Sequence, residues 1–276
     1  MRGTLHRQST KNGENLGLHA AESALLLWWE DFYRPVFEYV LPKMETLEGK
    51  KVLELGTGTG GTATLLAKRG ASVVGIDLLP FRLAEAKERT AQHNVADAVD
   101  FARMDATQLA FPDNTFDFVI SKSVLVFTEH AQTARECYRV LKPNGKAIFI
   151  ENMRNHPAVW LYRKLFLKYA GKLRYFSLRD IEAVGGEFEA MEHREFHLLA
   201  LGALLWQRGI SIPTFYRWTL RCLKGVDAFL LRLFPFLKRF CWITAMICQK
   251  DRTDAAQPAF FGGADMESRP DTRRRI

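Results

Sequence analysis

Short apolar runs alternate with helical ones from Lys51 onwards. The apolar runs are rich in β-branched residues and read KVLEL, ASVVGID, VDFARMD, FDFVIS and KAIFIEN. Between them lie stretches with helical spacing of apolar residues, TATLLAKRG, FRLAEAKERTAQ and TARECYRVL. Strand and helix in alternation specify parallel βαβ units, and fully apolar strands imply a sheet covered on both faces. The pattern therefore predicts an α/β fold with a mostly parallel sheet.

The segments on either side of this alternating core differ from it. From Ala20 to Val40 apolar residues recur at helical spacing, which predicts a helix before the core. After Asn155 the chain becomes helical, aromatic and basic, with strands expected at EAMEHREFHLL and CWITAMICQ. Both ends are too polar to bury much surface and are expected to be flexible tails. The expected parts are the first tail, a helical segment, the core, the carboxyl-terminal part of the fold and the last tail: 1–17, 18–47, 48–155, 156–250 and 251–276.

A basic amphipathic helix is predicted after Ser211 and Pro213. Its apolar stripe consists of six residues at helical spacing, Phe215, Trp218, Cys222, Val226, Phe229 and Leu233. Another face carries four cations, Arg217, Arg221, Lys224 and Arg232. The simpler interpretation packs the stripe on the core and leaves the cations in water. The alternative is a lid, at about residues 199–240, over a hydrophobic or lipid-like acceptor near a membrane surface.

Composition adds limits to this picture. The chain has 276 residues and 47% hydrophobic content, enough for one sizeable core. Its net charge of +8 is concentrated between Leu199 and Phe240, where seven cations face a single acid. Four scattered cysteines show no CxxC pair or ligand spacing, so neither a disulfide framework nor a metal site is expected.

Two further absences bear on the expected location. The longest uncharged apolar run, Phe196 to Gln207, is shorter than the ~20 residues that span a bilayer. No apolar segment of the kind found in secretory signals follows the early basic residues. We expect a cytoplasmic protein, with peripheral membrane contact through the basic helix as the extension of the lid hypothesis.

The first strand, Val52 to Leu55, runs directly into the glycine-rich loop 56–61, GTGTGG, and then into a helix. Glycines are needed where the backbone turns sharply and a ligand lies against it, and the helix amino terminus favours an anionic group. Asp77 closes the second strand about 20 residues later, where a carboxylate can accept both ribose hydroxyl hydrogens. Because glycines 56, 58 and 61 also satisfy GxGxxG, this loop alone leaves a dinucleotide and S-adenosylmethionine both open.

Four segments in order resemble the class I S-adenosylmethionine-dependent methyltransferases, especially the group that includes ubiquinone and menaquinone methylases. They are VLELGTGTG at 52–60, VVGID at 73–77, MDATQLAFPDNTFDFVIS at 104–121 and ECYRVLKPNGKAIFI at 136–150. The resemblance implies a Rossmann-like, doubly wound, mostly parallel seven-stranded sheet, with a helical lid inserted between the last two strands. It implies S-adenosylmethionine as cofactor and direct in-line methyl transfer. With the aromatic and basic helix, it favours a small hydrophobic or lipid-like acceptor.

Carried over by position, the resemblance implies a set of cofactor-binding residues. The loop residues would line the methionine part, with an acid shaping the loop, and the residues after the next strands would bind the ribose, the adenine and the space below the sulfonium. In that order they are Gly56, Thr57, Gly58 and Gly60, with Glu54; Asp77 for the ribose; Leu78, Asp105 and Ala106 for the adenine; and Ser121. A simpler alternative pairs Glu54 with a lysine and has Asp105 cap a turn.

The chemistry implied does not require a base, because the leaving group of a sulfonium becomes neutral and positioning supplies much of the rate. His130 and His156 are candidates, but packing is the simpler role for both. An NAD(P)-dependent oxidoreductase remains an alternative through GxGxxG and Asp77, although it leaves the segments 104–121 and 136–150 unexplained. An adenosylmethionine-binding module without catalysis is another. An RNA methyltransferase rests on net charge alone, and no RNA-binding module supports a nucleic acid partner. The sequence identifies neither the acceptor nor the oligomeric state.

Overall fold

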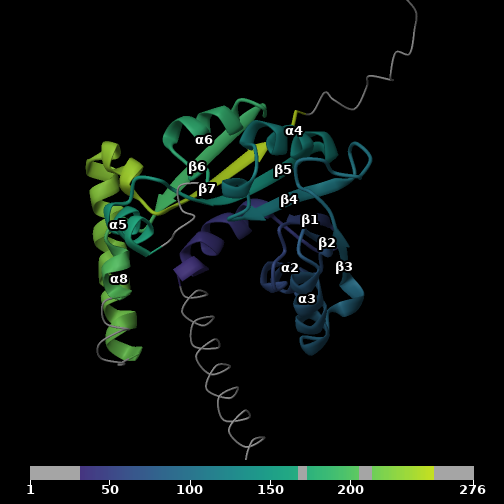
Figure 1. Ribbon diagram of the computed structural model, residues 1–276, viewed down its shortest axis with the longest axis horizontal. Coiled ribbons are helices and arrows are strands. Elements are labelled where there is room, and N and C mark those ends of the chain that lie inside the picture. Colours follow the sequence, from purple (N-terminus) through teal and green to yellow (C-terminus); the bar gives the residue numbers. More distant parts are fainter. Residues whose placement is uncertain (1–31, 167–172, 205–212, 252–276) are drawn as a thin grey trace, which may run out of the picture.

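The computed structural model describes residues 32–166, 173–204 and 213–251. The segment 1–17 and residues 252–276, expected to be tails, lie outside the described residues, as does the first part of the expected helix from Ala20 to Val40. Residues 32–40 of that helix are helical. Figure 1 shows a central sheet with helices on both of its faces.

Within the described residues, seven strands form one sheet in the order β3-β2-β1-β4-β5-β7-β6. Five of them pair in parallel: β1 (Lys51–Leu55), β2 (Ser72–Asp77), β3 (Val99–Arg103), β4 (Phe116–Lys122) and β5 (Leu141–Asn152). The two strands expected after Asn155 are β6 (Ala190–Phe196) and β7 (Ile243–Gln249). Strand β7 pairs antiparallel with both β5 and β6. The prediction of a mostly parallel seven-stranded sheet is therefore confirmed.

Two apolar cores lie on the two faces of the sheet. One contains residues of the helical segment 32–40 and of α2 (Gly61–Ala67), and Figure 1 shows α3 (Pro80–Gln92) next to α2. The other contains residues of α4 (His130–Val140) and α6 (Leu178–Gly185). Alternate residues of β5 enter the two cores, with Ile148 in the first and Phe149 in the second. Burial on both faces explains why these strands are apolar throughout.

The segment between β6 and β7 contains η5 (Ala200–Leu204), α8 (Pro213–Leu233) and η6 (Pro235–Phe240), and α5 (Pro157–Phe166) follows β5. The helical insertion between the last two strands is therefore present. The simpler interpretation of its apolar stripe is wrong, because Trp218, Phe229 and Leu233 are 59%, 65% and 56% exposed. The face of α8 turned toward the protein instead carries Leu220 and Asp227.

The reason is a cluster of backbone hydrogen bonds made by Asp227. Its carboxylate accepts from the backbone N–H groups of Leu198, Leu199 and Ala200, at 3.0, 2.8 and 3.3 Å. Hydrogen bonds to a charged group are stronger than neutral ones, and a buried carboxylate without partners would be costly. These bonds hold the face of α8 that carries Leu220 and Asp227 against the turn after β6. No helix in the described ranges is both long and apolar enough to cross a bilayer.

Candidate functional site

The loop between β1 and α2 passes three times through left-handed backbone. Gly56, Gly58 and Gly60 have φ values of 59°, 53° and 75°, which residues with a side chain rarely adopt. A Cβ on Gly56 would collide with Val124, and one on Gly60 would lie 2.9 Å from the Cβ of Ala86 in α3. Glycine is therefore required both by the conformation of the loop and by its close packing.

Two carboxylates hold this loop. Asp77 accepts a hydrogen bond from Gly58 N at Oδ2 and one from Leu79 N at Oδ1, both at 3.0 Å. Glu54 is 3% exposed and accepts a 2.6 Å hydrogen bond from the hydroxyl of Thr57. Burial raises the pKa of Glu54 to about 7, although the bond from Thr57 acts in the opposite direction. Glu54 therefore stabilises the loop from inside the protein rather than facing a ligand.

A cavity of about 1030 Å³ opens beside the loop. One wall is the loop itself, from Gly56 to Thr59, and another is the helical segment 32–40, which contributes Tyr33 and Phe37. Lys122 and Ser123, at the end of β4, also line it. Of the predicted cofactor residues, Gly56, Thr57 and Gly58 line this cavity, whereas Gly60 packs on α3.

Ser121 does not line the cavity, because it is fully buried. Its hydroxyl donates to Glu151 Oε1 at 3.1 Å, and the same oxygen accepts from the N–H groups of Val124 and Leu125 at 3.1 and 3.0 Å. Burial raises the pKa of Glu151 to about 7, against the effect of these hydrogen bonds. Ser121 and Glu151 together shape the chain where it leaves β4.

Sequence reasoning missed Tyr33 and Ser123, whose hydroxyl-bearing side chains also line the cavity. The Tyr33 hydroxyl oxygen lies 3.3 Å from Ser123 Oγ, which also accepts a 2.9 Å hydrogen bond from Asn152 Nδ2. Ser123 has a positive φ of 59°, which turns the chain sharply after β4. The signal available in the sequence was position, because Ser123 follows directly on the carboxyl end of a parallel strand.

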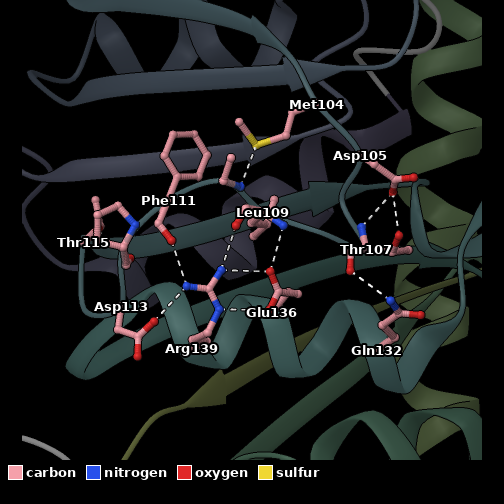
Figure 2. A network of polar contacts seen from close by, with 12 residues as sticks. Met104, Asp105, Thr107, Leu109, Phe111, Asp113, Thr115, Gln132, Glu136 and Arg139 are labelled. Carbon is pink, nitrogen blue, oxygen red and sulfur yellow. Dashed lines mark hydrogen bonds and ion pairs between the residues drawn. The ribbon is translucent and has the colours of Figure 1, made fainter. Parts of the chain in front are cut away.

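Asp105 and Ala106 follow β3 at the same edge of the sheet as Asp77, since Met104 N donates to the carbonyl of Asp77 at 3.3 Å. Asp105 Oδ1 accepts hydrogen bonds from both N and Oγ1 of Thr107, each at 2.8 Å (Figure 2). Asp105 therefore caps a turn, as in the simpler alternative. Ala106 is buried, and Leu78 is exposed next to Asp77.

Arg139 in α4 ties the loop after β3 to the body of the fold. It donates to the carbonyls of Leu109 and Phe111 at 2.8 and 2.7 Å, and pairs with Asp113 and Glu136, each at 2.8 Å (Figure 2). Glu136 in turn accepts a 2.7 Å bond from Leu109 N. The segments 104–121 and 136–150 therefore act as one unit, in which the second fixes the loop of the first.

The two histidines considered as bases are both buried. His130 Nε2 lies 3.1 Å from the carbonyl of Arg174, and its ring stacks on Phe176 with centroids 4.3 Å apart. His156 Nε2 lies 3.0 Å from the carbonyl of Leu198. Burial lowers the pKa of each ring, which favours the neutral form. Neither lines the cavity beside the loop, so both have packing roles.

A second cavity of about 590 Å³ lies between β6, α8 and the helical segment 32–40. It is lined by titratable side chains, among them His193, Glu195 and Asp227. No glycine-loop residue lines it, whereas Gly56, Thr57 and Gly58 line the larger cavity. Across the described ranges, no group of three or more His, Cys, Asp and Glu side chains could hold a metal ion.

The order of the strands separates the two cofactor classes that the loop leaves open. A dinucleotide-binding sheet has parallel strands in the order 3-2-1-4-5-6, whereas here the antiparallel β7 lies between β5 and β6. Residues 53–149 match the family profile described as a methyltransferase domain. Over that range the chain is similar to a methyltransferase domain. The match agrees with the class I resemblance seen in the sequence.

Curated relatives of this methyltransferase domain include two enzymes of quinone methylation. The ubiquinone biosynthesis O-methyltransferase of Pseudomonas aeruginosa is 31% identical over 152 residues, which cover 51% of this chain and 64% of the relative. The demethylmenaquinone methyltransferase of Thermus thermophilus is 39% identical over 105 residues, 37% of this chain and 47% of the relative. The chain thus spans less than two thirds of the length of either relative.

Solved structures extend the likeness of the methyltransferase domain to most of the fold. Phosphoethanolamine N-methyltransferase 2 of Haemonchus contortus, in complex with S-adenosylmethionine, superposes with a TM-score of 0.57 at 20% identity. The match covers 77% of this chain and 51% of that one. At this identity the likeness establishes the fold, including the sheet beyond residue 149.

Proposed function

We propose that this chain transfers the methyl group of S-adenosylmethionine to a small hydrophobic acceptor. The observation that carries the proposal is the cavity beside the glycine loop, which backbone groups of Gly56, Thr57 and Gly58 share with Tyr33 and Ser123. A ligand held by the loop would present its reactive end to the hydroxyl groups of Tyr33 and Ser123. The methyltransferase domain family supports the same assignment.

Charge around the cavity suits the anionic end of the cofactor. Five cations line the cavity against one acid, Glu38; they are Arg34, Arg69, Arg82, Arg89 and Lys122. We propose that Gly56, Thr57 and Gly58 hold the methionine part near these charges, and that Gly60 and Glu54 maintain the loop. The left-handed glycines keep the loop free of side chains, which lets a carboxylate approach its backbone, although the N–H groups of Thr57, Gly58 and Gly60 already donate within the protein.

We propose that the nucleoside lies along the ends of β2 and β3. Asp77 would accept hydrogen bonds from the ribose hydroxyls while keeping the loop in place through Gly58. Leu78 would cover the adenine, and Ala106 would contact its edge. Asp105 would use Oδ2 for the adenine amino group, because Oδ1 binds Thr107.

The bound cofactor supplies a methyl group on a positively charged sulfur, which becomes neutral as it leaves. The chain would therefore act mainly by holding the acceptor in line and excluding water. Correct alignment is worth ~7 to 11 kcal/mol in favourable intramolecular reactions. The hydroxyls of Tyr33 and Ser123 are placed to orient an acceptor oxygen, whereas Ser121 positions the end of β4 through Glu151. No catalytic base is assigned.

Two observations support a hydrophobic acceptor. The named relatives methylate quinone precursors, and apolar side chains of Phe37, Leu41 and Leu65 line the cavity. The insertion that contains α8 would form the lid over such an acceptor. A cytoplasmic chain that contacts a membrane at its periphery would meet a hydrophobic acceptor where that acceptor is most concentrated.

Calorimetry with S-adenosylmethionine, S-adenosylhomocysteine and NAD tests the cofactor. We expect both sulfur compounds to bind and NAD not to bind; the reverse would end the proposal. Asp77→Asn should weaken adenosylmethionine binding about ten- to hundred-fold, because a hydrogen bond to a charged group is worth ~1.5 to 3 kcal/mol. Asp97→Asn, an exposed acid in η2 (Ala96–Ala98), is the matched control. An unchanged dissociation constant for Asp77→Asn would remove that residue from the site.

The acceptor is tested by transfer of a radiolabelled methyl group into a cell extract. The extract is separated afterwards into lipid, RNA, protein and small-molecule fractions. Label in the lipid or apolar small-molecule fraction is expected. Label only in RNA would favour the nucleic acid alternative, and label only in polar small molecules would contradict the hydrophobic acceptor.

A further inference from the structure

Helix α8 carries an exposed apolar stripe, and two aromatic rings at η6 continue it. Its members are each between 41% and 65% exposed: Phe215, Trp218, Val226, Phe229, Leu233, Phe234 and Phe236. The rings of Phe215 and Trp218 stack with centroids 5.9 Å apart, and those of Phe234 and Phe236 are 6.0 Å apart. A surface helix of a globular protein normally turns such a stripe toward the core. We call this set the α8 surface.

The orientation of α8 is fixed by its opposite side. Asp227, 6% exposed, bonds the backbone of Leu198, Leu199 and Ala200 from that side. Rotating the helix to bury the stripe would break these three bonds and bring the carboxylate to the surface. The hydrogen bonds of Asp227 therefore hold the apolar stripe of α8 toward solvent.

Two exposed cations of α8 flank the α8 surface, and one of them, Arg232, also lines the second cavity with Glu38, Glu195 and Asp227. Arg221 and Arg232 follow Trp218 and Phe229 by three residues each, so they lie beside the stripe on the helix, and both are exposed. From residue 213 to residue 240 the sole acid in the sequence is Asp227, which faces the protein. An aromatic stripe with cations along its flank matches the chemistry of an anionic lipid interface.

We propose that the α8 surface docks the protein on an anionic lipid bilayer, with the aromatic rings at the headgroup boundary and Arg221 and Arg232 at lipid phosphates. This inference rests on the proposed function, because it explains how a hydrophobic acceptor reaches the enzyme. A second copy of the chain fits less well. A two-fold interface through this face would bring arginines of both copies into one contact, with no acid of residues 213–240 other than the inward Asp227 to pair with them.

The position of α8 in the fold suits this role. Strands β5 and β6 are both antiparallel to β7, so they run in the same direction. The turn after β6, to which Asp227 binds, therefore lies at the edge of the sheet where β1 enters the glycine loop. Helix α5, with Trp160 and Phe166 exposed, begins beside the same turn through the contact of His156 with Leu198. Docking through α8 would hold this edge close to the bilayer.

The test is cosedimentation of the full chain with vesicles of phosphatidylcholine, with and without phosphatidylglycerol. We expect binding to the anionic vesicles at low salt. Phe229→Ser should lower the partition coefficient about ten-fold, since one ring is withdrawn from the interface. Arg221→Gln and Arg232→Gln should each lower it about five-fold, on anionic vesicles alone. Lys87→Gln, an exposed cation on α3, is the matched control and should bind as the parent does.

Binding that is absent, or equal for the parent and for Phe229→Ser, would overturn the inference. So would a dimer in solution without lipid that Phe229→Ser abolishes, because the surface would then serve a second copy. The same variants are measured with S-adenosylmethionine by calorimetry, where an unchanged dissociation constant also shows that they are folded. A parent protein that does not bind adenosylmethionine would contradict the proposed function. A parent protein that binds adenosylmethionine but not vesicles would contradict only the inference that the α8 surface docks on a bilayer.

Discussion

Glu151→Gln is expected to change how the stability of the protein depends on pH. Glu151 is 1% exposed, and its Oε2 has no hydrogen-bond partner in the described part of the chain, while Oε1 accepts from Ser121, Val124 and Leu125. Burial raises its pKa from 4.5 to about 7. A glutamine keeps the acceptor at Oε1 and cannot ionise, so it mimics the protonated acid.

The direction of the effect follows from proton binding. Between the unfolded and the native pKa the native state binds the extra proton, so this group's contribution to stability falls as the pH rises through that interval. A rise of the pKa from 4.5 to about 7 corresponds to about 3 kcal/mol at 1.36 kcal/mol per unit. The variant lacks this loss, and it should gain about 2 to 3 kcal/mol relative to the parent between about pH 5 and pH 8.

Urea unfolding at about pH 5 and at about pH 8 measures the difference in the free energy of unfolding between Glu151→Gln and the parent protein. The exposed Glu189→Gln is the matched control and should shift stability equally at both pH values. If the free-energy difference between Glu151→Gln and the parent were the same at the two pH values, Glu151 would not hold its proton in the native state. The reasoning from burial would then be refuted.

Three further substitutions probe the loop and its support. Gly60→Ala should lower the free energy of unfolding by about 1 to 3 kcal/mol, because its φ is positive and its Cβ would meet Ala86; urea unfolding measures this, and Gly225→Ala in open space should not destabilise. Arg139→Met should speed amide hydrogen exchange at Leu109, since the loop loses its anchor; unchanged exchange would contradict that role. Thr57→Val should raise the pKa of Glu54 further, because the hydrogen bond from the Thr57 hydroxyl lowers that pKa. The free energy of unfolding should therefore fall more at about pH 8 than at about pH 6 in the same urea assay. An equal loss at both pH values would argue against this coupling.

The core of the fold could be predicted from the sequence because local pattern and tertiary context agree there. The apolar runs became β1 to β5, and the glycine loop lies where the first strand ends. Asp77 and Asp105 lie at one edge of the sheet, as the parallel arrangement requires. The structure gives the positions of the site residues, and the binding roles assigned to them remain predictions.

The sequence could not show in which direction a helix face or a side chain points. Helical spacing shows which residues of α8 share a face, but not whether that face points inward, and the bonds of Asp227 to the turn after β6 decide it. The same holds for Ser121, whose side chain turns to Glu151 rather than to the cavity. Both depend on partners more than 25 residues away in the chain, which a local pattern does not reveal.

The wall that Tyr33 and Phe37 provide has a consequence for how such enzymes diversify. These residues precede the matched domain, yet they face the glycine loop across the same cavity. A fragment limited to residues 53–149 would keep the cofactor loop and lose one side of the chamber. Under the proposed function, exchange of the helix that carries Tyr33 and Phe37 would alter the acceptor side of this cavity and leave the glycine loop in place.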